Sequence, residues 1–172
     1  MLQKNIKGMM RTKYKVLGFC LISIVFIGCD RATKDFAKIH LRDKEPLSWF
    51  HNTVRLEYAE NTGAFLSFGE DLPKSMSFWL FSALPLLFLS GFFIYALKKS
   101  GTMNFLEMLA FTLIFSGGIG NIIDRILFDR HVTDFMNVGI QGLRTGIFNF
   151  ADVYVTLGVL LLVLKNIRIA SK

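Results

Sequence analysis

Three aspartates stand in or beside stretches of sequence that are otherwise suited to lipid. Asp124 closes one apolar segment, Asp134 lies in the segment that follows, and Asp152 lies within the next apolar segment. A carboxylate at a bilayer centre costs about 2.5–3.5 kcal/mol on insertion scales. Such a group is retained mainly where it is paired, faces a polar cavity or performs chemistry. Asp124 and Asp152 are therefore the first candidates for function, whereas Asp134, taken alone, would be an ordinary loop acid.

The chemistry that such acids favour is hydrolysis by a carboxylate pair. Two carboxyl groups within hydrogen-bonding reach cannot both ionise easily, so they share one proton. The charged member can take a proton from water while the other protonates a carbonyl oxygen, as in aspartic proteases. The sequence contains no His-Glu-x-x-His zinc motif, no Gly-x-Ser-x-Gly motif and no phosphate-binding loop. Spacing alone does not select which two of the three acids would form the pair.

Two of the acids have polar neighbours at helical spacing. Asn121, Asp124 and Arg125 follow an i, i+3, i+4 pattern, so they share one helix face, where Arg125 can keep Asp124 charged. Asn149 and Asp152 also share a face. As the eighth residue of its apolar segment, Asp152 is expected roughly 10 Å inside that span. A structural ion pair at a helix end would explain Asp124 equally well, whereas a buried Asp152 favours function.

The composition indicates a membrane protein. The 172 residues are 52% hydrophobic and 19% charged, against about 25% charged in average globular proteins. Apolar segments of sufficient length predict a single integral-membrane domain over residues 1–172 with four transmembrane helices. The predicted spans cover about residues 16–37, 75–97, 105–124 and 147–165.

The segment between the first two spans predicts a small sheet outside the membrane. Residues Val54–Tyr58 alternate with a period of two, which is typical of a strand. Asn61-Thr62-Gly63 is typical of a turn, and Ala64–Phe68 could return as a second strand.

The distribution of basic residues predicts the orientation. The net charge is +7, but the bases gather in residues 1–15, in the loop 98–104 and after Leu164, which is the pattern of the positive-inside rule rather than of nucleic-acid binding. We therefore expect both termini in the cytoplasm, with residues 30–74 and 125–147 outside.

The N-terminal region allows two interpretations. A basic start, a short apolar run and Phe26-Ile27-Gly28-Cys29 are typical of a lipoprotein signal peptide that is cleaved before Cys29. Alternatively, the helix continues through Ala37, with Asp30 and Lys34 paired at i, i+4. The three later spans favour the uncleaved helix. Cys20 and Cys29 indicate neither a disulfide framework nor a zinc site.

Five short blocks, in order between the four spans, resemble the lipoprotein signal peptidases, also called signal peptidase II, over about residues 16–165. This family comprises bacterial inner-membrane aspartic proteases. The blocks are Asp30-Arg-Ala-Thr-Lys34, Asn61-Thr-Gly-Ala64, Gly117-Gly-Ile-Gly-Asn-Ile-Ile-Asp-Arg125, Val132-Thr-Asp-Phe135 and Phe148-Asn-Phe-Ala-Asp152.

The resemblance implies a catalytic pair of Asp134 and Asp152, a choice that residue chemistry alone left open. It also implies four transmembrane helices with a small extracytoplasmic β-cradle. Asn61 and Asn121 match positions that contact substrate, whereas Asp124 and Arg125 match supporting positions. The full set of implied binding or supporting residues is Asp30, Lys34, Asn61, Gly63, Asn121, Asp124, Arg125 and Asn149.

The activity implied by the resemblance is removal of signal peptides from prolipoproteins that carry diacylglyceryl on the lipobox cysteine. Prolipoproteins and membrane lipid are then the expected partners, with no metal, cofactor or nucleic acid and with a monomeric enzyme. The expected location is the bacterial inner membrane, with the active site near its extracytoplasmic face. Phe65 and Thr133 depart from the residues usual in the family, which could alter lipid or peptide preference.

An alternative of another class is a small membrane protein without enzymatic activity, such as a transporter subunit or an assembly factor. It would use Asp124, Arg125 and Asp152 as a proton or ion relay. Retention of function after substitution of both acids would favour this alternative.

Overall fold

Four long apolar helices and a small sheet make up the part of the chain that the structure describes. This computed structural model describes residues 2–64, 68–140 and 142–170, without the side chains of residues 2–9, 11 and 168–170. The long helices are each long and apolar enough to cross a membrane. They are α1 (Leu2–His40), the continuous helix made by α2 (Lys74–Phe78), a π-helical turn (Trp79–Ala83) and α3 (Leu84–Lys99), then α4 (Phe105–Leu127) and α5 (Phe150–Ala170).

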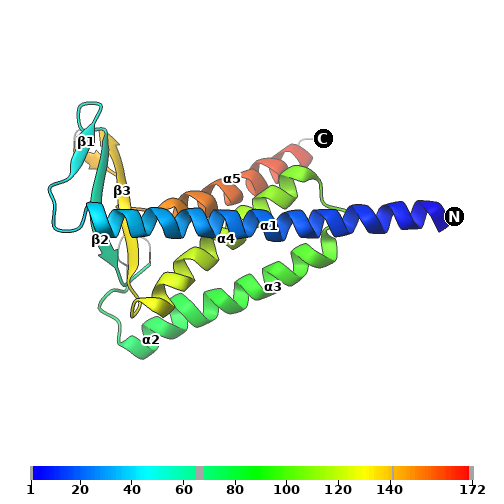
Figure 1. Cartoon of the computed structure of the whole chain (residues 1–172), viewed down its shortest axis with the longest axis horizontal. Coiled ribbons are helices and arrows are strands. Elements are labelled where there is room, and N and C mark those ends of the chain that lie inside the picture. Colours follow the sequence, from blue (N-terminus) through cyan, green and yellow to red (C-terminus); the bar gives the residue numbers. More distant parts are fainter. Residues whose placement is uncertain (1, 65–67, 141, 171–172) are drawn as a thin grey trace.

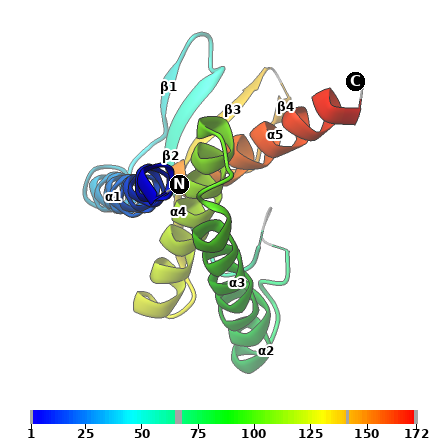
Figure 2. The ribbon, with the colours of Figure 1, turned by 90° about the vertical axis from the view of Figure 1, so that its right-hand side faces the viewer.

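Helix α4 lies at the centre, and α1, α3 and α5 surround it (Figure 2). Small residues on α4 and α5 permit this close approach. A Cβ atom added at Gly117 would lie 2.2 Å from the carbonyl oxygen of Ala151, and one added at Gly158 would lie 2.7 Å from that of Ala110. The backbones of α4 and α5 therefore touch where the sequence has glycine.

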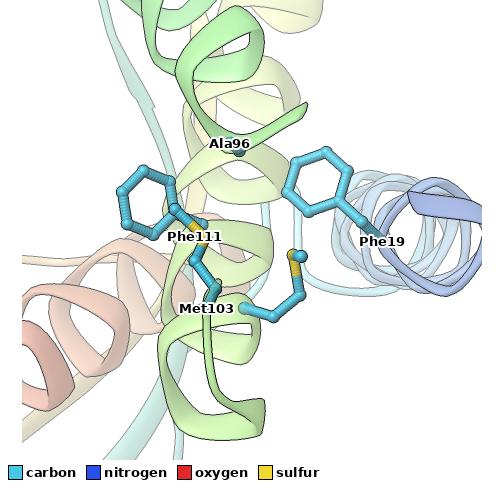
Figure 3. Packing of buried hydrophobic residues seen from close by; sticks show 5 residues of the cluster. Phe19, Ala96, Met103 and Phe111 are labelled. Carbon is cyan, nitrogen blue, oxygen red and sulfur yellow. The ribbon is translucent and has the colours of Figure 1, made fainter. Parts of the chain in front are cut away.

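A cluster of buried aromatic and sulfur-containing side chains joins α1, α3 and α4 away from the sheet (Figure 3). The ring of Phe19 from α1 packs against Ala96 of α3 and Met103, and Phe111 of α4 lies on the other side of this group. This core fixes the helices at the end remote from the polar residues discussed below.

Proline accounts for the π-helical turn. Pro85 has no N–H group, and its ring would clash with the carbonyl four residues earlier in a regular α-helix. The N–H of Leu84 donates to the carbonyl of Trp79, five residues back. The helix thus widens before Pro85 and continues to Lys99 without ending.

The sheet lies across the end of the bundle where α1 finishes, opposite the N-terminus (Figure 1). In the described residues it has four antiparallel strands in the order β1 (Leu47–Trp49), β2 (Val54–Asn61), β3 (Val132–Ile140) and β4 (Leu143–Arg144). A register shift between Leu56 and Ala59 interrupts the β2–β3 pairing just before Asp134, which pairs with Ala59.

The predicted fold class, an α-helical membrane protein of four spans with a small sheet, is confirmed. Two details of the prediction differ. Helix α5 begins at Phe150 rather than near residue 147, because Asn149 caps it. The return strand expected over Ala64–Phe68 falls largely on residues outside the description, and the strands that pair with β2 are β1 and β3.

The contact between α4 and α5 can be tested at Gly117. Replacing Gly117 by Ala puts a methyl group against the backbone of α5, and we expect it to lower the free energy of unfolding by about 1–3 kcal/mol. Thermal melts of purified protein in detergent measure the effect. The matched control is Gly91→Ala in α3, where an added Cβ meets nothing within 4 Å; its melting temperature should be unchanged or higher. Equal melts for both variants would contradict the close packing.

Candidate active site

Asp134 enters the site from β3, with its side chain buried to 4% exposure. The side-chain nitrogen of Asn149 donates to Oδ1 of Asp134 at 2.6 Å, and that of Asn61 donates to Oδ2 at 3.5 Å. Burial and the neighbouring charge of Asp152 raise the pKa of Asp134 from its ordinary value of 3.8 to about 7. Asp134 can therefore hold a proton at neutral pH.

Asp152 reaches the same place from the first turn of α5. Its Oδ1 accepts a hydrogen bond from the side-chain nitrogen of Asn121 at 2.8 Å, and its Oδ2 accepts one from the backbone N–H of Asn149 at 3.0 Å. The expectation that Asp152 lies about 10 Å inside a span is wrong, because the helix begins only two residues earlier. A carboxylate at this position also benefits from the helix dipole.

Asn149 links the two carboxylates. Its side-chain oxygen accepts from the N–H of Asp152 at 3.1 Å, which completes a reciprocal capping arrangement with the Asp152 carboxylate. Its side-chain nitrogen lies within hydrogen-bonding distance of Oδ1 of Asp134 and of Oδ1 of Asn121, at 2.6 and 3.1 Å. The fully buried side chain of Asn149 thus caps α5 and contacts both Asp134 and Asn121, the partner of Asp152.

A fully buried lysine orients Asn121. The ammonium group of Lys34 on α1 donates to Oδ1 of Asn121 at 2.9 Å, which leaves the amide nitrogen of Asn121 to face Asp152. The same ammonium lies 2.8 Å from Asp30 and 3.1 Å from Asp124. The i, i+4 pair of Asp30 and Lys34 therefore forms as its spacing predicted, and it is shared with α4.

Asp124 does not pair with Arg125, contrary to the expectation from their spacing. In the described part of the chain its cationic partners are Lys34 and Arg31, and its Oδ2 also accepts from the backbone N–H of Thr133 at 3.3 Å. The sequence did not predict that Arg31 pairs with Asp124, because i, i+4 spacing gives Arg31 a partner in Asp35, and the structure shows that Arg31 binds both carboxylates. Nothing in the local spacing indicates a partner so distant along the chain.

Arg125 instead holds the segment that follows β2. Its guanidinium donates to the carbonyl of Gly63 at 2.7 Å. Asn61 stabilises the same turn, since its Oδ1 accepts from the N–H of Gly63 at 2.9 Å and its nitrogen donates to the carbonyl of Ala64 at 3.0 Å. Phe65, one of the two departures noted above, lies outside the described residues.

Both acids open into a pocket of about 710 Å³ beside α3, α4 and α5. Its polar wall near the carboxylates includes Asn61, Asn121 and Arg125. The rest of the wall is largely apolar and continues along the spanning helices, with Phe81, Pro85, Ile122, Val155 and Leu157 among its members. The pocket therefore joins a buried carboxylate pair to a surface suited to an apolar chain.

All ten residues predicted for the site contribute to one connected region. Asp134 and Asp152 line the pocket together with Asn61, Asn121 and Arg125. Gly63 lies in the turn beside Asn61, and Asn149 lies between the acids. The remaining three, Asp30, Lys34 and Asp124, form the buried ion cluster behind the pocket.

A family model matches most of the chain. The model of signal peptidase (SPase) II covers residues 22–168. The chain belongs to this family. Signal peptidase II is a family of peptidases.

Several curated relatives of this chain come from Borrelia species. Proteins named lipoprotein signal peptidase are 40% identical over 73% of this chain and 74% of the relative in Borrelia garinii subsp. bavariensis, and 36% identical over 87% and 88% in Borrelia turicatae. That of Borrelia hermsii is 32% identical over 92% and 94%. A solved structure described as a bacterial membrane enzyme superposes with a TM-score of 0.76 at 27% identity, over 90% of both chains.

The ion cluster of this signal peptidase II can be tested at Lys34. Lys34→Met leaves Asp30 and Asp124 buried without the cation they share, and we expect a loss of about 3–5 kcal/mol in the free energy of unfolding. Chemical or thermal unfolding in detergent measures it. Lys74→Met, which breaks the exposed pair with Asp129, is the control and should melt like the wild type. A similar melting temperature for Lys34→Met would contradict the role of the cluster.

Proposed function

We propose that this chain removes the signal peptide from prolipoproteins modified with diacylglyceryl, cutting before the lipid-bearing cysteine, with Asp134 and Asp152 as the catalytic pair. The observation that carries the proposal is the link through Asn149, which places both carboxylates at one pocket. Both acids come from one chain, so the reaction requires no second copy.

The two acids would take different roles. The raised pKa of Asp134 makes it the member that keeps the proton, and Asp152 is then the member that acts as the base. Asp152 then accepts a proton from the attacking water as Asp134 protonates the oxygen of the scissile carbonyl. The tetrahedral intermediate collapses when Asp152 gives its proton to the nitrogen of the leaving cysteine and Asp134 takes back the hydroxyl proton, so the C–N bond breaks and both acids return to their starting states.

The pocket suits a substrate that is partly lipid. Its apolar wall runs beside the spanning helices, where an acyl chain or an apolar signal helix would lie. Its polar part contains Asn61 and Arg125, which would contact the peptide backbone. The acids lie at the end of α5 rather than in its middle, so water can reach them.

The proposed orientation places the sheet outside the cell membrane. The N-terminus of α1 and the C-terminus of α5 lie at the same end of the bundle, opposite the sheet (Figure 1). The bases of residues 1–15 and Lys165 belong to that end, which the positive-inside rule assigns to the cytoplasm. The catalytic pair would then act at the extracytoplasmic face of the bacterial inner membrane.

The function is tested with purified protein in detergent and a synthetic lipobox peptide carrying diacylglyceryl on its cysteine. We expect the wild type to release the signal segment, and Asp134→Asn and Asp152→Asn each to lower the rate by at least about 10²–10⁴-fold while remaining folded. Mass spectrometry of the products locates the cleaved bond. Lys74→Met, which is remote from the pocket, is the control with full activity.

Two results would count against this proposal. An intact peptide after incubation with folded wild type would remove the assigned substrate. Cleavage by both aspartate variants at the wild-type rate would remove the assigned pair.

The raised pKa of Asp134 predicts a pH dependence of activity and of stability. The cleavage rate should fall as pH rises through about 7, because Asp134 loses its proton. Between its unfolded value of 3.8 and about 7 the folded protein binds the extra proton, so this residue's contribution to stability falls as pH rises through that window and is constant above it. Asp134→Asn should remove this dependence and melt higher than the wild type at pH 8. Parallel melting profiles of both proteins from pH 5 to about 8 would contradict the assignment.

A further inference from the structure

Four exposed apolar side chains lie at the end of the sheet that is remote from the catalytic pair. Trp49 at the end of β1 and Phe50 after it are 45% and 77% exposed, and Ile140 and Leu143 at the β3–β4 turn are 70% and 84% exposed. Because β2 and β3 are antiparallel neighbours, the turn before β2 and the turn after β3 lie at the same end of the sheet. We call these four residues the apolar edge.

Hydrogen bonds hold the two turns of the apolar edge together. The guanidinium of Arg144 donates to the carbonyl of Asn52 at 2.7 Å, and the N–H of Gly139 donates to the carbonyl of Thr53 at 2.8 Å. The apolar edge is therefore one surface formed by both hairpins.

The backbone of the first turn is strained. Phe50, His51 and Asn52 have φ values of 52°, 53° and 69°. The left-handed region is tolerated by Asn but is a genuine outlier for a bulky residue such as Phe. Such strain is typical of positions that serve a function other than packing. We therefore expect the exposed Phe50 to contact a surface outside this chain.

Three members of the apolar edge, Trp49, Ile140 and Leu143, lie on the face of the sheet that carries Asp134. Alternate residues of a strand share a face, so Val138 and Ile140 lie on the face of Asp134, which contacts the start of α5. Trp49 pairs with Val54, and Val54 pairs with Val138, which extends this face to β1. Near the apolar edge the opposite face carries the polar residues Ser48, Arg55, Asn137 and Arg144, whereas Phe135, farther along that face, packs against Ala37 and Leu41 of α1.

Seen along the bundle, the β1–β2 hairpin reaches past the outline of α1 and α4 (Figure 2). Seen from the side, it stays in the layer at the helix ends (Figure 1). The apolar edge therefore projects sideways beyond the helices, over the volume that surrounds them. Around helices that span a membrane, this is the lipid.

We propose that the apolar edge inserts into the lipid interface of the membrane that the four helices span. Trp is enriched at membrane interfaces, where its ring tolerates both lipid and water. Near the edge, the part of the opposite face that carries Ser48 and Arg55 remains in water. The contact fixes the height of β3, and so of Asp134, above the lipid. It depends on the spanning helices and not on the catalytic pair.

The test measures the depth of a fluorophore in nanodiscs. Cys20 and Cys29 are replaced by Ser, and an environment-sensitive dye is attached to Phe50→Cys. The control is the same dye on Ser48→Cys, which pairs with Arg55 on the face opposite to that of Trp49. We expect nitroxide-labelled lipids to quench the dye at residue 50 several-fold more strongly than at residue 48, and aqueous iodide to show the reverse order. Equal quenching of both dyes by iodide would overturn the proposal.

A second measurement separates lipid from other occupants. Nanodiscs loaded with one chain should protect the dye at residue 50 as well as discs loaded with two; protection only in two-chain discs would make the surface a contact between copies and refute lipid insertion. Phe50→Asn, which suits the left-handed backbone, should melt no lower than the wild type. Combined with Trp49→Ser it should expose a dye on Ile140→Cys to iodide, and an unchanged dye would refute the anchoring role of the aromatic pair.

Discussion

The buried ammonium of Lys34 is the constraint on which the rest of the structure depends. It lies among two carboxylates and an amide oxygen, from Asp30, Asp124 and Asn121, so it joins α1 to α4. Asp30 in turn accepts from the N–H of Ala151, which adds the first turn of α5. A charge in such surroundings is stable only with all its partners in place. Three helices are therefore held in one relative position at the level of the pocket.

That position determines how the two acids meet. Lys34 occupies the oxygen of Asn121, so the nitrogen of Asn121 faces Asp152. Asn149 caps α5 through its side-chain oxygen and donates to Asp134 through its side-chain nitrogen. A local capping arrangement and a long-range ion cluster thus share one hydrogen-bond network. The carboxylates are placed by groups that are themselves buried and satisfied, which is what a preorganised site requires.

The two ends of the sheet have different roles. At one end, β3 brings Asp134 to the start of α5. At the other, the apolar edge extends beyond the bundle and, in our proposal, rests in lipid. Because β3 connects the two, the depth of the edge in the membrane and the height of the acids are linked. For a family of peptidases embedded in a membrane, this link would keep water, lipid and the scissile bond at the same level.

The sequence by itself determined the four apolar spans and the pairing of Asp30 with Lys34, because these follow from local composition and helical spacing. The proposed site residues came instead from the resemblance of five short blocks to the family. The sequence could not determine that Asp124 pairs with Arg31 and Lys34 rather than with Arg125, or that Asp152 lies at a helix start, since an apolar run does not mark where Asn149 caps the helix. It also did not reveal the apolar edge, whose members come from two hairpins. Contacts between residues far apart in the chain arise from packing, and only the tertiary structure decides them.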